Sequence, residues 1–591
     1  MNTEHVWRYT FVGTLFSLMA MLIVGQMVRI QTNPSQVAML RNQQAGYATV
    51  PHTIYPARGE ITDRWGNLLA GNKTVYEVGV ELSRVKNPHT IALTLNVVLG
   101  LDYNTIYKIA SKPPSADAVY AVLDDYVTQD KIDLLEKYKE EITTNYTGNN
   151  KEDPPSLAGL VYTPHPQRSY PEKDLASNIL GFVGRDDKGD IRGYYGVEAK
   201  FNSLLAGNPI TVFVPNDPNQ AEELPKIPDG ASLVLTIDRE IQAEMESIVD
   251  QAVDNTGAES ATIVVYDPKT GDILAMATTP RMDLNKYWTY GDIFKGDTPF
   301  DRAISQAYEP GSVYKVLTMA AGLDSGAVKP DTSFLDTGVF EIGGTYIHNW
   351  NYGAWGPQDM QGCLQHSLNV CLAWVASQTG AKNFYNYMRA FGIGHQTGVD
   401  MAGEASGRLK VPGDSDWYDA DLGTNAFGQG VSATPLQMAV AVGAIANDGK
   451  MLAPRIVRSL INNGHQFDTE VRVTGMPITA ETAHTLTNML ANSLEEEASN
   501  ALVDGYRVAG KTGTAEIPTP YGYTSNVTNA SFVGWGPVDD PRFLVYVWLE
   551  KPKTSIWGSE VAAPIFKQVV ERLVVLMNIP PDNVRHQLNG Q

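Results

Sequence analysis

Twenty residues without a charge, Tyr9 to Val28, lie near the start of this chain. A helix of that length is about 30 Å long, which matches the hydrocarbon core of a bilayer. A secretory signal peptide is the competing interpretation. It would have a shorter apolar core that ends at a small-x-small cleavage site, and no convincing site follows Val24 or Gly25. We therefore predict an uncleaved membrane anchor.

Charges beside this run do not settle its orientation. Arg8 precedes the run, whereas Arg29 and Arg41 follow it, so neither side has a clear excess of basic residues close to the membrane. The asymmetry that remains is one of size, because nearly all of the chain lies on the C-terminal side.

The composition bounds the classes of function. The chain has 591 residues, 43% of them hydrophobic, which allows several domains with cores of their own. It carries 45 Lys and Arg against 66 Asp and Glu, a net charge of −21, and this argues against nucleic acid as a partner because phosphate recognition needs a basic face. Two cysteines, Cys363 and Cys371, are too few for a disulfide framework or a thiolate metal cluster. We expect them to be buried free thiols rather than a bridge.

The rest of the chain divides near a proline-rich stretch between Pro215 and Pro228. Before it, short elements alternate with Gly and Pro turns and carry no cluster of catalytic residue types. After it we predict strands over 262–266, 272–277, 530–536 and 542–549, with helices between them. Strands at both ends of this region indicate an α/β or α+β domain whose sheet is closed by distant segments. A long polar loop is expected from Glu516 to Asn529.

Ser312 and Lys315 are the candidate nucleophile and proton acceptor. They follow Pro310 and Gly311 at the start of an apolar stretch, which predicts a buried helix with both side chains on one face. A hydroxyl there lies near the positive end of the helix dipole. The spacing alone is weak evidence, because Ser83 and Lys86 repeat it in a polar stretch.

Two further motifs follow in order, Ser367-Leu368-Asn369 and then Lys511-Thr512-Gly513-Thr514. Lys269-Thr270-Gly271 also reads Lys-Thr-Gly, but it lies in an expected hairpin turn and precedes the other motifs. In this order, the three motifs are similar to the signature of class A β-lactamases and penicillin-binding proteins. The signature has Asp where this chain has Leu368, at a position that varies among these transpeptidases.

The chain as a whole resembles class B penicillin-binding proteins, which are monofunctional peptidoglycan D,D-transpeptidases with one membrane anchor. Non-catalytic motifs of that family are matched by Arg58-Gly59 through Asp63-Arg64 and Gly66, by Arg168 through Tyr170-Pro171, and by Gly196 with Glu198. The resemblance implies an α+β protein with a tail and single transmembrane helix over 1–30 and an extended α+β pedestal (dimerisation-type) domain over 31–228. A transpeptidase domain over 229–591 follows, with the antiparallel sheet and helices on both faces of serine β-lactamases.

The resemblance also implies a role for each site residue. Ser312 attacks the carbonyl of a D-Ala-D-Ala peptide bond, and Lys315 takes its proton as a free amine, which requires a pKa lowered by burial and by a positive charge such as Lys511. Ser367 passes a proton to the leaving D-alanine, and Asn369 holds the peptide and the Lys315 amine. The substrate carboxylate is received by Lys511, Thr512 and Thr514 beside Gly513, and the N–H groups of Ser312 and Thr514 form the oxyanion hole.

The acceptor that resolves the acyl-serine separates the functional hypotheses. An amine of a neighbouring stem peptide makes the protein a transpeptidase, whereas water makes it a D,D-carboxypeptidase or a β-lactamase. The N-terminal anchor with a pedestal favours transpeptidation. A non-catalytic β-lactam sensor or scaffold is the alternative of a different class. The chain has neither His-Glu-x-x-His nor Gly-x-Ser-x-Gly, and we expect no metal and no cofactor.

The family further implies a place and partners. Ligands would be peptidoglycan stem peptides and β-lactams, and the macromolecular partner a multispanning glycosyltransferase of the SEDS type that polymerises glycan. We expect a single-pass protein of the bacterial cytoplasmic membrane with its pedestal and catalytic domains on the extracytoplasmic side. Glu309 in Tyr-Glu-Pro-Gly-Ser and the Lys-Thr-Gly-Thr form of the third motif favour a division-type over an elongation-type enzyme, with both kept open.

Overall fold

The computed structural model describes residues 3–33, 49–114, 119–145, 154–187, 189–215, 225–496, 500–519 and 522–588. The chain forms two units, one from Met1–Ala57 with Gly207–Gly230 and one from Arg58–Ala206 with Ala231–Gln591. The predicted domain bounds after residues 30 and 228 follow the family resemblance and not this division, and they stay a prediction.

The first unit contains the apolar helix. α1 (Thr3–Thr32) includes the span Trp7–Arg29, which has a mean hydropathy of 2.0 and is not buried by other parts of the protein. Among the described residues it is the one helix that is long and apolar enough to cross a membrane. β1 (Thr49–Ile54) and β8 (Ile210–Pro215) form an antiparallel ladder in the same unit.

A seven-stranded sheet in the second unit joins segments from both predicted soluble domains. Its order is β18-β17-β9-β2-β3-β4, and β5 also pairs with β3. β2 (Ile61–Thr62) runs parallel to β9 (Ser232–Leu235), with Ile61 opposite Leu233. The other strands are β3 (Leu68–Glu81), β4 (Tyr120–Val127), β5 (Leu160–Ser169), β17 (Val457–Asn462) and β18 (His465–Asp468). Backbone hydrogen bonds therefore connect the predicted pedestal segment to the predicted transpeptidase segment.

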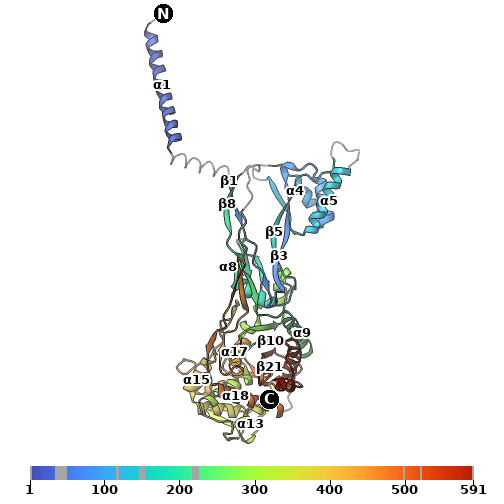
Figure 1. The fold of residues 1–591 in the computed structure, drawn as a ribbon, viewed down its shortest axis with the longest axis vertical. Helices are drawn as coiled ribbons and strands as arrows, with labels where there is room; N and C mark the ends of the chain where they lie inside the picture. The colour runs from blue at the N-terminus through green and yellow to red at the C-terminus, as the bar shows by residue number, and fades with distance from the viewer. Residues whose placement is uncertain are drawn as a thin grey trace. The chain divides into compact units, whose positions relative to one another are not determined.

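A separate small core lies along β3. Helices α3 (Pro88–Leu99), α4 (Tyr103–Ala110) and α5 (Gln129–Asn145) contribute to it, with Ile91, Leu95 and Leu135 fully buried. The side chains of Asn87 and Asp102 cap α3 and α4 by accepting from backbone N–H groups at 2.8 Å. Figure 1 shows α4 and α5 at one end of the β3 and β5 ladder.

Three of the non-catalytic motif residues form a buried ion cluster. The Glu198 carboxylate is fully buried and accepts from Arg58 Nε and from Arg168 Nε, each at 2.7 Å. Arg58 also donates to Asn202 Oδ1, and Arg168 donates to the Gly59 carbonyl. One carboxylate on α7 (Gly196–Lys200) thus holds the segment before β2 and the end of β5 together.

The catalytic region is built on a five-stranded antiparallel sheet in the order β11-β10-β22-β21-β20. The strands are β10 (Ser260–Tyr266), β11 (Ile273–Thr278), β20 (Ala509–Thr519), β21 (Gly522–Gly536) and β22 (Phe543–Glu550). The first two strands form the predicted hairpin, and β10 pairs with β22, with Val264 opposite Tyr546. The prediction that distant segments close the sheet is confirmed.

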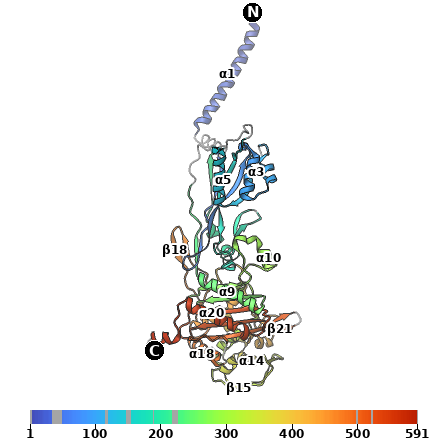
Figure 2. The same ribbon diagram turned by 90° about the vertical axis from the view of Figure 1, so that its right-hand side faces the viewer.

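Helices cover both faces of this sheet. Along β10, Ile263 and Val265 lie in one core cluster, and Val264 and Tyr266 lie in the other, as the alternation of a strand requires. α9 (Arg239–Thr256) and α20 (Ala563–Leu576) cover the first face, and α12 (Lys315–Asp324), α17 (Pro435–Ala446) and α18 (Ala480–Glu496) cover the second. In Figure 2, α9 and α18 lie on opposite sides of the strands. The predicted α+β fold class is confirmed.

The polar stretch from Glu516 to Asn529 is not a loop in its described residues. β20 continues to Thr519 and β21 begins at Gly522, so the two strands form one long hairpin with Thr519 opposite Gly522. The predicted loop was therefore wrong. The end of this hairpin leaves Tyr523 and Val527 exposed, and it lacks the apolar alternation by which a half-buried strand is recognised in a sequence.

The remaining elements of the second unit are short. They are η1 (Leu82–Arg84), α6 (Ser177–Leu180), β6 (Phe182–Arg185), β7 (Ile191–Tyr194), α8 (Asn202–Ala206), η3 (Leu284–Thr289), α10 (Tyr290–Phe294), α11 (Arg302–Ser305), η4 (Gly311–Tyr314), β12 (Phe334–Asp336), β13 (Val339–Ile342), β14 (Thr345–His348), β15 (Gly356–Gln358), α13 (Met360–Gln365), α14 (Asn369–Thr379), α15 (Ala381–Ala390), α16 (Asp419–Asn425), β16 (Met451–Leu452), β19 (Val473–Gly475), α19 (Gly558–Val561) and α21 (Asp582–Leu588). Several of them position the candidate site.

Candidate active site

Ser312 lies in a short 3-10 turn, η4, that leads directly into the buried helix α12. Gly311 before it has φ +61°, and its N–H donates to the Gly428 carbonyl at 3.1 Å. The chain therefore turns just before the serine, as the Pro-Gly pair predicts. Residues three apart eclipse in a 3-10 turn, so Lys315 projects on the same side as Ser312.

Lys315 is fully buried, and its amine contacts the second motif. Nζ donates to the Ser367 carbonyl oxygen at 2.6 Å and to Ser367 Oγ at 3.1 Å. Within the described residues, no hydrogen bond joins the Ser312 hydroxyl to this amine. Catalytic hydrogen bonds often shorten only when substrate is bound, so the predicted proton transfer between Ser312 and Lys315 stays a prediction.

The environment of Lys315 favours a neutral amine. Burial, followed by the nearby positive charge of Lys511, holds the pKa of Lys315 well below its ordinary value. Lys511 is itself nearly buried on β20, and its amine donates to Thr512 Oγ1 at 3.3 Å. Both causes expected from the sequence are therefore present, and an uncharged amine is able to accept a proton.

Ser367 and Asn369 lie where α13 ends and α14 begins. Ser367 has φ +54°, a left-handed conformation that is uncommon for a residue other than glycine. Asn369 is the first residue of α14, and its Nδ2 donates to the His348 carbonyl of β14 at 3.1 Å. The structure thus places Ser367 against Lys315, and it holds Asn369 by a hydrogen bond to the neighbouring strand β14.

The third motif lies against the first one. β20 is the edge strand of its sheet, so alternate backbone groups of Lys511 to Thr514 point away from β21. A Cβ atom on Gly513 would lie 2.9 Å from Val313 Cγ1 and 2.2 Å from Ser531 Oγ. Only glycine allows β20 to pack this closely on η4. Thr514 Oγ1 accepts from the Gly558 N–H of α19 at 3.0 Å.

The two sequence repeats of the motifs lie elsewhere. Ser83 and Lys86 are exposed around η1 in the pedestal. Lys269 lies in the turn between β10 and β11, where it pairs with Asp540. Neither repeat belongs to η4, to the turn between α13 and α14 or to β20, the elements that carry the three motifs.

Sequence reasoning missed the supporting glycines and the disulfide. A Cβ atom on Gly428 would lie 2.3 Å from the Gly311 carbonyl oxygen, and one on Gly558 would lie 2.1 Å from the Gly513 carbonyl oxygen. Both glycines therefore allow close packing of backbone around the serine. The pattern Gly428-Gln429-Gly430 was the available signal for the first of them.

Cys363 and Cys371 form a disulfide, so the expectation of free thiols is wrong. Both residues are fully buried, as expected. In one continuous helix two residues eight apart would be separated by about 12 Å. The chain instead turns at Ser367 between two helices, and this places the two Cα atoms 6.0 Å apart, within bonding range.

Comparison with known proteins agrees with this arrangement. The family described as the penicillin binding protein transpeptidase domain matches residues 261–571, which is more than half of the chain, and the penicillin-binding protein dimerisation domain matches residues 53–222. The chain belongs to the class B penicillin-binding proteins. It is a serine-type peptidoglycan D,D-transpeptidase with an N-terminal apolar helix, a dimerisation domain and a transpeptidase domain.

Similar proteins span nearly the whole transpeptidase. Stage V sporulation protein D of Bacillus subtilis is 31% identical over 89% of this chain and 79% of its own length. Peptidoglycan D,D-transpeptidase FtsI of Escherichia coli is 26% identical over 98% of this chain and 93% of its own length. The crystal structure of penicillin binding protein 3 of Mycobacterium tuberculosis, complexed with aztreonam, has 25% identity and a TM-score of 0.66, and it covers 90% of this chain and 98% of that one.

Removing the charge of Lys511 is expected to change the pH dependence of acylation. In Lys511→Gln the second cause of the lowered Lys315 pKa is lost, so this pKa rises toward its ordinary value. The rate constant for reaction with a fluorescent penicillin should therefore begin to fall at a higher pH than in the wild type as the solution is made more acidic. Lys269→Gln, in the other Lys-Thr-Gly, is the control and should leave the profile in place. An unshifted profile in Lys511→Gln would show that Lys511 does not act on Lys315.

Proposed function

We propose that Ser312 forms the acyl-enzyme of this transpeptidase and that Lys315 is its general base. Ser312 Oγ attacks the carbonyl carbon of the D-Ala-D-Ala bond of a donor stem peptide, and its proton passes to Lys315 Nζ. Ser367 then delivers its hydroxyl proton to the nitrogen of the leaving D-alanine and takes in exchange the proton held by Lys315, which becomes a free amine again. An amine of a second stem peptide attacks the ester, forms the cross-link and returns the proton to the Ser312 oxygen.

The observation that carries this proposal is the state of Lys315. Its amine is buried, its pKa is lowered, and it donates to both Ser367 oxygens. A charged lysine could not act as a base, whereas a neutral amine in contact with a second hydroxyl can pass a proton between two reacting groups. No carboxylate among the described residues pairs with this amine. Burial of such a group lowers the stability of the fold, and a catalytic use would explain why the amine is nevertheless buried.

The remaining site residues are assigned to substrate binding. Lys511 carries the positive charge that attracts the terminal carboxylate, with the half-exposed Thr512 and Thr514 as hydrogen-bond donors beside the buried Gly513. The donor peptide lies along the free edge of β20 as an added strand. Asn369 holds its amide groups from α14. The N–H groups of Ser312 and Thr514 bind the oxyanion, a contribution of about 3–4 kcal/mol per donor in comparable enzymes.

The place of the reaction is the outer side of the bacterial cytoplasmic membrane. α1 is the anchor, with the pedestal and catalytic regions on the extracytoplasmic side. The Cys363–Cys371 disulfide supports this side, because disulfides persist in oxidising compartments and are rare in the cytoplasm. Glycan polymerisation is assigned to a SEDS-type glycosyltransferase partner that contacts the anchor and the pedestal. Division is favoured over elongation as the process, on the basis of Glu309 in Tyr-Glu-Pro-Gly-Ser and of the Lys-Thr-Gly-Thr form of the third motif.

Cross-linking of stem peptides tests the function. The purified protein is supplied with polymerised glycan strands and an amine acceptor, and the products are separated by mass. We expect cross-linked dimers with one D-alanine released for each new bond. Release of D-alanine without dimers would assign the protein to the carboxypeptidases, and a lack of both products while penicillin still binds covalently would favour the sensor hypothesis.

A further inference from the structure

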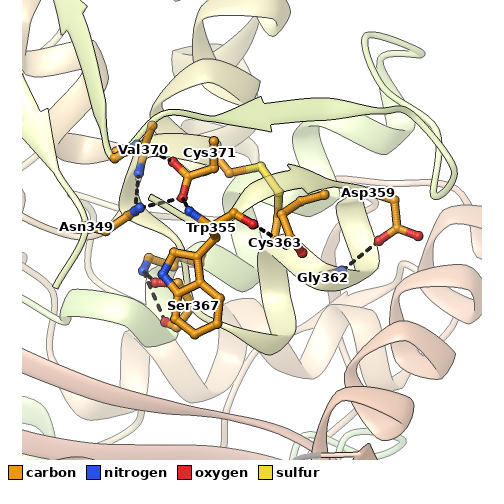
Figure 3. Close-up of a disulfide and its surroundings, with 12 residues drawn as sticks. Asn349, Trp355, Asp359, Gly362, Cys363, Ser367, Val370 and Cys371 are labelled. Atoms are coloured by element: carbon orange, nitrogen blue, oxygen red, sulfur yellow. Dashed lines mark hydrogen bonds between the residues drawn. A yellow bond between two sulfur atoms is a disulfide. The ribbon is translucent and has the colours of Figure 1, made fainter. Parts of the chain in front are cut away.

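Ser367 is the midpoint of the short ring that the Cys363–Cys371 disulfide closes, since the two cysteines are eight residues apart. We propose that this disulfide is a positioning element of the active site, which holds Ser367 against the Lys315 amine and so keeps the proton path to the leaving group in place. The inference rests on the proposed role of Ser367 and extends it to two residues for which the family motifs assign no function. Figure 3 draws the bridge and Ser367 in one close-up.

The backbone inside the ring is held in an unfavourable conformation. Ser367 has φ +54°, and residues other than glycine occupy this region only when their surroundings impose it. The turn also contains two backbone hydrogen bonds, from Ser367 N–H to the Leu364 carbonyl at 3.2 Å and from Leu368 N–H to the Cys363 carbonyl at 3.0 Å. The disulfide links the two ends of this turn covalently. If the backbone at Ser367 relaxed, the two ends of the turn would move apart or distort, and the disulfide opposes this movement.

The two helices joined by the turn are fixed at their starts by other groups. Asp359 accepts from Gly362 N–H at 2.8 Å at the start of α13. Asn349 accepts from Val370 N–H at 3.2 Å at the start of α14 and donates to Asp336 Oδ2 at 2.7 Å. These contacts orient each helix (Figure 3). These hydrogen bonds lie outside the turn at Ser367, whereas the disulfide joins its two sides.

The contact that depends on the turn is the one to the catalytic lysine. Lys315 Nζ donates to the carbonyl oxygen of Ser367 as well as to its hydroxyl. A shift of the Ser367 backbone therefore moves both acceptors of the amine, and a rotation of the side chain alone cannot restore the geometry. Among the residues assigned to substrate binding, only Asn369 lies inside the ring, and its bond to the His348 carbonyl at 3.1 Å holds it to β14 without the bridge. Loss of the bridge should consequently slow the chemical step and leave non-covalent affinity unchanged.

The test is the Cys363→Ala/Cys371→Ala double variant. Reaction with a fluorescent penicillin is followed over time. The amplitude then measures the fraction of the enzyme that is folded, and the rate constant measures the reactivity of the folded molecules. We expect wild-type amplitude and non-covalent dissociation constant, with an acylation rate constant about 10- to 100-fold lower, the range that a displacement of about 1 Å at a reacting group produces. A wild-type rate constant, or a lower amplitude at a wild-type rate constant, would overturn the proposal.

Val375→Ala is the matched control for lost packing. Val375 is a fully buried residue of α14, and its truncation leaves the bridge intact. We expect an unchanged rate constant in this variant. If it slows acylation as much as the double variant does, the effect comes from core packing and the proposal is wrong.

Reduction of the folded wild type provides a second measurement in case the double variant does not fold. A thiolate of a dithiol attacks the sulfur of one cysteine, which releases the other cysteine as a thiolate and gives a mixed disulfide. The second thiol of the reagent then displaces the first cysteine, leaving two protein thiols and a cyclic oxidised dithiol. Alkylation and mass measurement give the reduced fraction. We expect the acylation time course to contain a slow phase whose amplitude equals the reduced fraction, and we expect this phase to disappear on reoxidation with a small-molecule disulfide. A reduced fraction that reacts at the wild-type rate contradicts the proposal. Failure of the untreated protein to form any adduct would instead overturn the proposed function.

Discussion

A Ser312→Ala variant is expected to form no covalent adduct with a fluorescent penicillin, while its melting temperature stays that of the wild type. The substitution removes the oxygen that would carry the acyl group, so the loss should be complete rather than partial. Ser312 is only half-buried, and its hydroxyl has no hydrogen bond to a described residue, so the fold should hardly change. Fluorescence after denaturing electrophoresis and calorimetry of the same preparation measure the two outcomes.

Ser83→Ala is the matched control, because Ser83 belongs to the other Ser-x-x-Lys of the chain and is exposed in the pedestal. Its labelling should equal that of the wild type. Labelling that persists in Ser312→Ala would place the nucleophile elsewhere, and Ser367 would be the first candidate because Lys315 donates to its hydroxyl at 3.1 Å.

The second large effect is expected in the pedestal. Glu198→Ala should lower the free energy of unfolding by about 3–5 kcal/mol, the cost of removing one partner from a buried ion pair. The substitution leaves the side chains of Arg58 and Arg168, which are 9% and 4% exposed, without the carboxylate between them. Arg58 would keep its bond to Asn202, and Arg168 its bond to Gly59. These neutral acceptors do not balance two buried charges.

Glu140→Ala is the control for this prediction. Glu140 is an exposed glutamate of α5, and its loss should change stability by about 0.5 kcal/mol or less. Denaturant unfolding of the two variants beside the wild type measures the difference. Equal midpoints for Glu198→Ala and Glu140→Ala would mean that the cluster does not stabilise the fold.

The sequence predicted the elements whose physical signals are local. The apolar run became α1, and the turn residues at Asp267 to Gly271 predicted the hairpin of β10 and β11. Pro310 and Gly311 indicated a chain turn before the serine, and the structure has one. Each of these rests on a periodicity or a turn chemistry that a few neighbouring residues express by themselves.

The features that sequence reasoning missed depend on contacts between distant segments. Gly428 is required by the close approach of Gly311, and Gly558 by the close approach of Gly513. The pattern Gly428-Gln429-Gly430 marks the first glycine without showing which segment it contacts, and the residues beside Gly558 do not mark the second. The disulfide was missed because the positive φ of Ser367, which brings the cysteines together, has no local signal in Ser-Leu-Asn. The hairpin beyond Glu516 was missed because its exposed end needs no apolar face.

The central claim is that Ser312 carries the acyl group of the donor peptide, and direct mapping of that group tests it. The wild-type protein is mixed with a pentapeptide donor without acceptor, quenched with acid, digested and analysed by mass spectrometry. We predict that the peptide containing Ser312 gains the mass of the donor less one D-alanine, and that this peptide loses the added mass when an amine acceptor is present. An acyl group found on any other residue would contradict the account.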